Sequence, residues 1–278
     1  MMTQDFLGHI RDLAGKTRQN AYLTHTEFLS ASELSDFYTE LRRLPGGLSA
    51  NHPADSPMDI RSGTLDGVPF LVYGGHSEAE RNVLCFLPDW LSPEDFLTGE
   101  AANGEVLKML RVEPVNRRFA EALSHRDFLG ALMNLGIERN RIGDILVSDE
   151  ESCIFVLSSL SGLIAEELTR VKHTSVRCTL LPPGECGIAP RFQELGGSVA
   201  SCRLDALLAM VFSLSRGTAQ TLIERELAAV NGGTCLSAGH VLQPGDRVSL
   251  RGYGKFIFDG EEKRTKKGRL YVHCRRFV

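Results

Sequence analysis

The sequence is poor in aromatic residues and contains no C-x-x-C pair. Phe, Trp and Tyr make up 7% of the 278 residues, and Trp90 is the single tryptophan. The seven cysteines are odd in number and scattered, so they predict neither a disulfide framework nor a zinc site. The eight histidines show no metal-ligand spacing either. We therefore expect reduced, mostly buried thiols, no metal and no cofactor.

Long apolar runs are also missing. No window approaches the roughly 18 uninterrupted apolar residues that a membrane helix needs, and the start, Met1 to Asp5, is acidic where a signal peptide is basic. The sequence therefore predicts a cytoplasmic protein with no membrane contact. Its length suits about two or three domains, and 42% hydrophobic residues suffice for packed cores.

Charge is divided unevenly along the chain. Residues 203–278 hold 13 of the 31 Lys and Arg but only 7 of the 35 Asp and Glu, so this segment carries +6 and the remainder −10. A basic segment on an acidic body indicates a possible nucleic-acid contact. Charge steers binding without defining the partner, so the motifs must identify it.

The predicted fold class is α/β (α+β), in three folded parts and a linker. Residues 1–104 are expected to form an N-terminal α/β unit, 105–182 a middle domain, 183–202 a turn-rich linker, and 203–278 a C-terminal domain.

In the N-terminal unit, apolar residues recur at helical spacing up to about residue 44, and Pro45-Gly46-Gly47 ends that pattern. A proline-containing loop is expected over 49–58, followed by strands at 68–73 and 83–87.

The middle domain shows a β-α-β-β-α-β order, the split βαβ pattern of ferredoxin-like and RNA-recognition folds. An RNA-recognition sheet carries stacking aromatics on its third strand, whereas the third strand here offers only Phe155. A fold does not fix function, so the pattern favours a plain ferredoxin-like domain and leaves an RNA-binding sheet open. The expected elements are 106–112, a helix around 128–135, 142–147, 153–157, a helix over about 159–171, and 175–181.

The most specific pattern lies between Arg203 and Asp246, where two short helices precede a tight hairpin. Leu204 begins an apolar helix stripe, and Ser215 is placed to cap a second helix. Asn231 and Gly232 supply the positive φ angles of a two-residue turn. The remaining stripe residues are Leu207, Leu208, Val211 and Phe212 on the first helix, and Ala219, Leu222 and Ile223 on the second.

On the second helix, Arg216 and Gln220 are four residues apart and share one face, from which they are expected to meet phosphate or sugar. Asp205 is expected to favour the first turn of its helix and to order a neighbouring arginine.

This arrangement resembles the S4 (αL-like) RNA-binding domain, and the match in order and spacing covers most of the last 76 residues. The second helix of that family commonly ends at glycine, and this chain has Glu226 there. The glutamate either alters the RNA-binding groove or extends the helix by a turn.

Glycines, aromatics and cations follow the motif, in Arg251 to Phe256 and Lys263 to Arg269. Without the motif, such a charge run is typical of a solvated hairpin tip; with it, RNA contact is favoured. About five phosphate contacts would give a steep salt dependence, with a log–log slope of roughly −0.7 to −0.9 per contact. The predicted RNA-binding residues are Arg203, Ser215, Arg216, Gln220, Asn231, Arg251, Tyr253, Lys255, Lys266, Lys267 and Arg269.

A second resemblance spans essentially the whole chain. The stretch from His125 to Ile137, continuing through Arg139 to Ile142-Gly143-Asp144 and Val147, resembles the signature of YlmH-type bacterial proteins. The resemblance implies an acidic body with a C-terminal S4 domain, and binding to a large ribosomal subunit that carries a stalled peptidyl-tRNA, in ribosome-associated quality control. It also implies a link to cell division.

Catalytic alternatives were weighed against these motifs. His125-Arg126-Asp127 matches the start of a kinase catalytic loop, but Leu132 stands where the metal-binding Asn belongs, so a helix start is favoured. The stronger rival is an RNA-modifying enzyme, because pseudouridine synthases and some methyltransferases carry S4 domains. Pseudouridine synthases hold their catalytic aspartate in a G-R-L-D motif that is separate from the S4 domain. A methyltransferase needs a Gly-rich loop after its first strand, and the segment from Val72 to His76 matches such a loop only weakly.

The sequence thus predicts a non-catalytic protein that recognises structured rRNA or tRNA, on the large ribosomal subunit, in rescue of stalled translation. An RNA-modifying enzyme that docks its substrate through the S4 domain is the alternative. The oligomeric state is left open.

Overall fold

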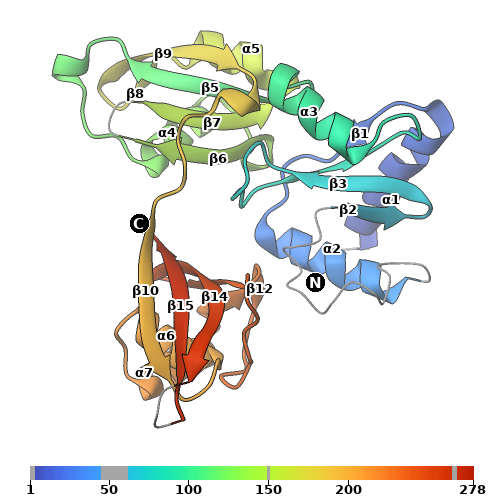
Figure 1. The fold of residues 1–278 in the computed structure, drawn as a ribbon. Helices are drawn as coiled ribbons and strands as arrows, with labels where there is room; N and C mark the ends of the chain where they lie inside the picture. Colours follow the sequence, from blue (N-terminus) through green and yellow to red (C-terminus); the bar gives the residue numbers. More distant parts are fainter. Residues whose placement is uncertain (1–3, 45–61, 149–150, 265–267) are drawn as a thin grey trace. The chain divides into compact units, whose positions relative to one another are not determined.

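The protein is a mixed α/β chain, seen here in a computed structural model that describes residues 4–44, 62–148, 151–264 and 268–278 (Figure 1). The predicted loop over 49–58 lies outside these residues. Contacts divide the chain into two compact units. One contains the described residues of 3–30 and 62–190, and the other those of 31–61 and 191–278.

The first unit begins with a four-stranded antiparallel sheet in the order β1-β4-β3-β2. The predicted strands at 68–73 and 83–87 are confirmed as β3 and β4. Helix α3 shows why its segment folds locally: Ser92 caps it, Pro93 occupies its first turn, and Gly104 ends it with a φ of 61°. The elements are α1 (Gln4–Asn20), β1 (Thr24–His25), β2 (Ser62–Leu65), β3 (Val68–Tyr73), β4 (Val83–Phe86) and α3 (Pro93–Asn103).

The same unit contains a five-stranded antiparallel sheet in the order β6-β7-β5-β9-β8. The chain runs β-α-β-β-α-β through it, as the sequence predicts, with the short β8 added at an edge. The second helix ends at Glu167, earlier than expected, because β8 folds back onto β9 around Lys172, whose φ is 51°. The elements are β5 (Leu107–Pro114), η2 (Arg117–Phe119), α4 (His125–Asn134), η3 (Arg139–Arg141), β6 (Ile142–Val147), β7 (Ser152–Leu157), α5 (Ser158–Glu167), β8 (Arg170–Val171), β9 (Thr174–Leu181) and η4 (Pro183–Glu185).

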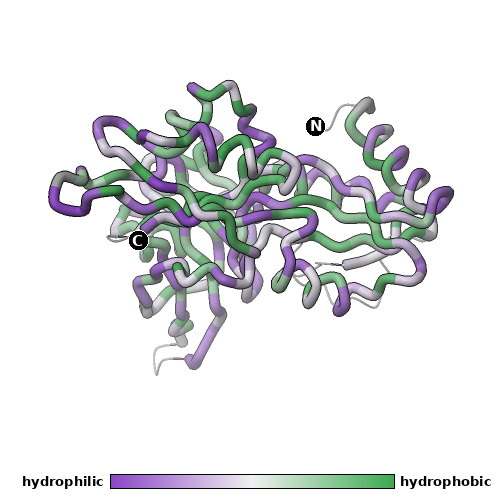
Figure 2. Tube along the Cα trace, turned by 90° about the horizontal axis from the view of Figure 1, so that it is seen from above, coloured by the Kyte–Doolittle hydropathy of each residue, from purple (hydrophilic) through white to green (hydrophobic). Residues whose placement is uncertain are grey.

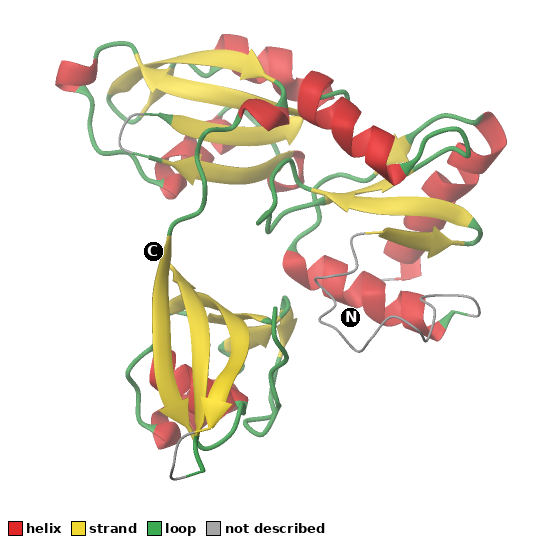
Figure 3. Ribbon diagram, in the orientation of Figure 1, coloured by secondary structure: helices red, strands yellow, loops and turns green. Residues whose placement is uncertain are grey.

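The second unit is built on a six-stranded antiparallel sheet in the order β10-β15-β14-β13-β11-β12. Helices α6 and α7 cover one face, where Leu207, Ile223 and Phe256 lie in a shared core (Figure 3). Helix α2 is grouped with this unit, and its first residue, Ala31, lies against Gly232. The elements are α2 (Ala31–Arg43), β10 (Phe192–Val199), α6 (Leu204–Val211), α7 (Arg216–Glu224), β11 (Ala228–Val230), β12 (Gly233–Thr234), β13 (Arg247–Leu250), β14 (Gly254–Arg264) and β15 (Leu270–Phe277).

Strand β10 corrects the predicted linker over 183–202. It pairs with β15 along its whole length, from Phe192 opposite Phe277 to Val199 opposite Leu270. The sequence pattern fails here because Gly196-Gly197 is typical of a turn. In the structure a Cβ at Gly197 would meet Met210 at 2.5 Å, so the glycine permits close packing within a strand.

Hydrophobic residues concentrate in the strands, whereas many connecting loops are hydrophilic (Figure 2). Within the described part of the chain, no single helix is long and apolar enough to cross a membrane; α6 and α7 pass that test only together, and they are bent by 117°. The described residues also contain no group of three or more His, Cys, Asp or Glu arranged to hold a metal ion.

Candidate nucleic-acid interface

A buried carboxylate organises the predicted RNA-binding residues of α6 and α7. Asp205, whose side chain is 0% exposed, accepts hydrogen bonds from the Arg203 Nε and Nη2 atoms at 3.2 and 3.3 Å. Arg216 donates to the same carboxylate at 2.8 Å, and the Gln220 amide donates at 3.1 Å. The arginine side chains remain 41% and 52% exposed, so they are fixed at one end and open to solvent. The predicted ordering role of Asp205 is confirmed.

The ionisation of Asp205 follows from these contacts. Burial raises the pKa of this carboxyl, but the hydrogen bonds from Arg203, Arg216 and Gln220 outweigh that effect and lower its pKa below the usual range for aspartate. The carboxylate is therefore charged at neutral pH, and it holds two cations and an amide in a fixed arrangement on one surface. Such a preorganised set of donors suits phosphate oxygens.

Two of the predicted RNA contacts have structural roles. Ser215 caps α7, because its Oγ accepts the Thr218 N–H at 3.0 Å. Asn231 is buried at 6% exposure, and its amide donates to Asp246 at 2.8 Å and accepts the Arg247 N–H at 2.9 Å. We therefore leave Asn231 out of the surface, because RNA does not reach a buried amide whose groups are already paired.

The hairpin turn at Asn231 is nevertheless the one that the sequence predicts. Asn231 and Gly232 have φ angles of 50° and 82°, and they connect β11 to β12. Two positive φ angles are typical of a type I′ turn, which matches the twist of the strands it joins.

The β13–β14 turn adds three further predicted residues to the same unit. Arg251, Tyr253 and Lys255 are all exposed there. The Arg251 backbone N–H donates to Leu227 O at 2.9 Å, which holds this turn against the end of α7. The Tyr253 ring lies 6.0 Å from that of Phe212, at the end of α6.

Arg276 is a candidate that the sequence pattern missed. Its guanidinium lies 5.1 Å from the centre of the Phe212 ring, and it donates to the Tyr253 carbonyl at 3.2 Å. The alternation of β15 gives a signal for it, because Arg276 shares a strand face with the buried Val272 and Cys274, on which α6 and α7 pack.

The remaining predicted cations belong to the β14–β15 hairpin. Arg269 is exposed and donates to the Ser198 carbonyl at 2.6 Å, which ties it to β10. Lys266 and Lys267 lie outside the described residues. The structure thus brings Arg203, Arg216 and Gln220 together around Asp205, and Arg251 and Tyr253 onto one turn.

The expected extension of the helix at Glu226 is wrong, whereas an effect of this residue on the RNA-binding groove stays a prediction. Helix α7 stops at Glu224, and Glu226 takes the left-handed conformation with a φ of 60°. Its N–H donates to Ile223 O at 3.0 Å, and that of Leu227 donates to Leu222 O at 3.1 Å. This pair of bonds is a Schellman motif, in which the left-handed residue is usually glycine. The helix is therefore not extended.

Glu226→Gly is expected to raise the free energy of unfolding by about 0.5–1 kcal/mol, because glycine adopts this backbone conformation without a Cβ clash. Chemical denaturation of the full chain measures it. Glu226→Ala is the control, since it removes the charge and keeps the Cβ. An equal gain in that control would assign the effect to charge rather than to the backbone.

The five-stranded sheet has no open face at its centre. One face packs on α4 and α5, through Leu110, Ile154 and Val156. The opposite face, which an RNA-recognition fold uses for stacking, packs on the N-terminal sheet and α3 through Met109, Phe155 and Leu157. Phe155 is 0% exposed. The one aromatic that the sequence offered for stacking is therefore a core residue.

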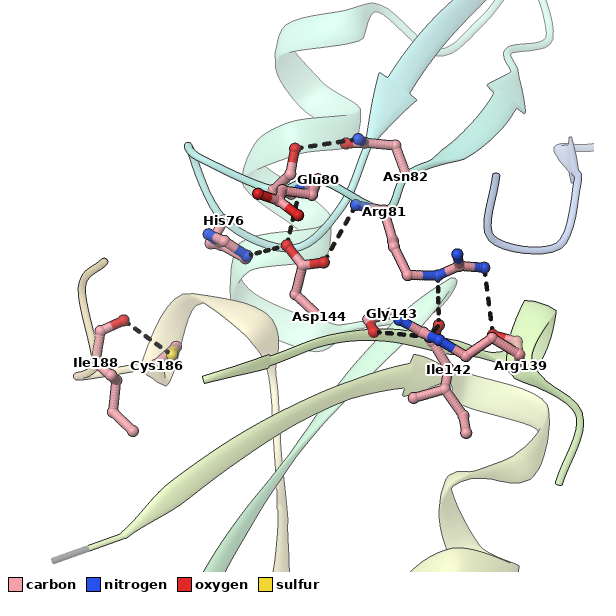
Figure 4. A network of polar contacts seen from close by, with 11 residues as sticks. His76, Glu80, Arg81, Asn82, Arg139, Ile142, Gly143, Asp144, Cys186 and Ile188 are labelled. Atoms are coloured by element: carbon pink, nitrogen blue, oxygen red, sulfur yellow. Dashed lines mark hydrogen bonds and ion pairs between the residues drawn. The ribbon is translucent and has the colours of Figure 1, made fainter. Parts of the chain in front are cut away.

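A polar network closes this face as well (Figure 4). The Asp144 carboxylate accepts the Glu80 and Arg81 backbone N–H groups at 2.8 and 3.2 Å, and it lies 3.0 Å from His76 Nε2. Arg81 donates to Ile142 O at 2.9 Å and to Phe28 O at 3.0 Å. Two far segments of the unit are thereby joined to β6.

Residues of the family signature build this joint. Besides Asp144 and Ile142, Arg139 donates to the Ile142 and Gly143 carbonyls at 2.6 and 3.3 Å. A Cβ at Gly143 would lie 2.7 Å from the Phe28 ring, so only glycine fits there. These signature residues have a structural role.

The segments behind the enzymatic alternatives also have structural explanations. A Cβ at Gly75, which has a φ of 89°, would lie 2.4 Å from the Phe155 ring, so this turn faces the core. In the H-R-D segment, Ser124 donates to Asp127 through N at 2.8 Å and Oγ at 2.7 Å, and Lys172 lies 2.9 Å away. The bonds from Lys172 and Ser124 lower the pKa of Asp127 to about 2. The predicted helix start is confirmed.

The part of the chain that contains this segment also matches a known protein family. The family model described as "Putative RNA-binding domain in YlmH" matches residues 107–183, from the start of β5 to η4. The chain is 28% identical over 203 residues to the ribosome-associated protein quality control protein P2 of Bacillus subtilis (strain 168), covering 72% of this chain and 74% of that protein. The cell division protein ylmH from Streptococcus pneumoniae aligns with a TM-score of 0.43 and 19% identity, covering 66% of this chain and 94% of that one. A TM-score of this size supports no argument about function.

Proposed function

We propose that this chain, a YlmH-type protein, is a non-catalytic RNA-binding protein that acts on the ribosome. Its ligand is structured rRNA or tRNA on the large subunit, and its role is the rescue of stalled translation in the cytoplasm. The RNA-binding family model over 107–183 and the similarity to a ribosome-associated quality control protein support the class.

The observation that carries the proposal is the cluster around Asp205. A buried carboxylate that holds Arg203, Arg216 and Gln220 on an exposed surface has the geometry of a phosphate-binding face. The order of α6, α7 and the β11–β12 hairpin supports the S4 domain that the sequence motif suggests. Arg251, Tyr253, Lys255, Arg269 and Arg276 extend this face in our proposal.

Arg216→Glu is expected to weaken binding to purified large ribosomal subunits, or to total tRNA, about tenfold at 0.1 M salt, because it reverses a charge at the phosphate face. The slope of log affinity against log salt should become less steep by about 0.7–0.9, the value for one phosphate contact. Sedimentation with subunits and filter binding with tRNA measure the two quantities.

Arg191→Glu is the matched control, because Arg191 is an exposed cation of the same unit outside the proposed face. Arg216→Gln separates lost attraction from repulsion near Asp205, and melting temperatures show whether each variant is folded. Unchanged affinity in folded Arg216→Glu would contradict the assigned face.

Incubating RNA with the protein, with or without S-adenosylmethionine, tests the non-catalytic part of the proposal. We expect no modified nucleoside by mass spectrometry. Appearance of pseudouridine or a methylated base would support the RNA-modifying alternative instead.

A further inference from the structure

We infer that the middle part of the chain carries a second RNA-contacting surface, a basic rim at one end of the five-stranded sheet, which binds the phosphate backbone. The inference rests on the proposed function, because it assumes that RNA is the partner. It names a different surface from the Asp205 face, on the other compact unit. We define the basic rim as the exposed cations of residues 113–127 and 170–177, namely Arg117, Arg118, Arg126, Arg170, Lys172 and Arg177.

The sheet face that RNA-recognition folds use for binding is not available in this domain. An RNA-recognition sheet presents aromatics on the face away from its helices. Here that face is packed against the N-terminal sheet, with Phe155 at 0% exposure and His76 stacked 5.0 Å from its ring. RNA contacts made by residues 107–183 must therefore lie at the periphery of the sheet.

Hydrogen bonds bring two distant segments together at one such edge. The Val115 N–H donates to Ser175 O at 2.9 Å, and the Glu121 N–H donates to Thr174 Oγ1 at 3.1 Å. Lys172 Nζ lies 2.9 Å from Asp127 at the start of α4. The connection from β5 to α4 and the β8–β9 hairpin thus form one end of the sheet, at the left of the unit in Figure 1.

Charge is separated within residues 107–183, the segment that the family model matches. Residues 113–127 and 170–177 contain six Lys and Arg against three acids, Glu113, Glu121 and Asp127, for a balance of +3. The rest of 107–183 contains four Lys and Arg against seven acids, for a balance of −3. A domain with no net charge therefore concentrates its cations at one end, which is the electrostatic footprint of a polyanion site.

The chemistry of the rim matches phosphates better than bases. Guanidinium and ammonium groups donate charge-assisted hydrogen bonds to phosphate oxygens. Two of its cations pair with acids of the same segments, since Arg117 lies 3.7 Å from Glu113 and Lys172 lies 2.9 Å from Asp127, so the test below uses Arg170 and Arg177. The rim is a positioning surface, and it reads the shape of a helix rather than its sequence.

The test reverses two cations in the full chain. Arg170 and Arg177 are exposed on β8 and β9, so Arg170→Glu with Arg177→Glu leaves the core untouched. Affinity for total tRNA, for protein-free rRNA and for purified large ribosomal subunits is measured from 0.05 to 0.3 M salt. We expect at least a tenfold loss at 0.1 M salt and a log–log slope lower by about 1.4–1.8, for two contacts.

The matched control is Arg11→Glu with Lys16→Glu, which reverses two exposed cations of α1 in the same unit and should leave affinity and slope unchanged. Melting temperatures of both variants report folding, and Arg170→Gln with Arg177→Gln replaces the charge reversal if that variant unfolds.

Affinity equal to that of the control, while Arg216→Glu still weakens binding, would overturn the assignment of the rim and leave the proposed function standing. Unchanged binding in all three variants would overturn both. Weaker binding to ribosomal subunits with full affinity for naked tRNA and rRNA would assign the rim to an acidic protein partner and overturn it as an RNA surface.

Discussion

Replacing Phe155 with alanine is expected to lower the free energy of unfolding by about 3–5 kcal/mol and to leave the RNA affinity of the folded protein unchanged. The ring is 0% exposed and lies in the core that joins the N-terminal sheet to the five-stranded sheet. The turn at Gly75 and the strand at Gly143 both approach it closely. Its removal leaves a cavity that these packed strands cannot collapse to fill.

Two measurements on one variant decide this prediction. Chemical denaturation gives the stability, and filter binding with tRNA, below the unfolding transition, gives the affinity. Leu180→Ala on β9 is the control, because it truncates an apolar side chain of the same sheet that is 38% exposed. A loss of affinity without a loss of stability would show that the ring reaches RNA, as it does in RNA-recognition sheets.

Removing the Asp205 carboxylate is the second large effect. Asp205→Ala is expected to cost about 2–4 kcal/mol of stability, since it deletes a fully buried acceptor of bonds from Arg203, Arg216 and Gln220. RNA affinity should fall about tenfold, because the two arginines lose their fixed orientation. Asp205→Asn is the matched variant: it keeps the shape and one acceptor oxygen, so its loss should be smaller in both measurements.

The same carboxylate predicts a pH dependence. Its pKa is lower in the folded than in the unfolded chain, so the folded state binds fewer protons in acid. Its contribution to stability is complete above the unfolded pKa of about 4 and is lost as the pH falls through the lower folded value. Asp205→Asn should therefore flatten the fall in melting temperature below about pH 4. An equal fall in melting temperature with pH in Asp205→Asn and in the native chain would contradict the role assigned to the charge of Asp205.

The order of elements was predictable from local patterns. Apolar runs and periodicity identified the strands and helices of the five-stranded sheet, since its helices bury one face and its central strands bury both. The pattern of α6, α7 and the Asn231-Gly232 turn was equally readable, because capping, stripe spacing and positive φ are properties of a few neighbouring residues. The difference in net charge between residues 203–278 and the rest of the chain follows from the composition alone.

Where these elements place their side chains depends on tertiary packing. β10 looked like a linker because its glycines are explained by contacts with Met210 and Tyr271, far away in sequence. Phe155 looked available for stacking because the sheet that covers it comes from another part of the chain. The sequence left open whether Glu226 extends its helix, because backbone conformation at a helix end depends on the packing that follows. Local patterns in the sequence fix the elements and the sign of charge along the chain. Burial, and the convergence of cations at Asp205 and at the rim, depend on contacts between distant segments that no local pattern encodes.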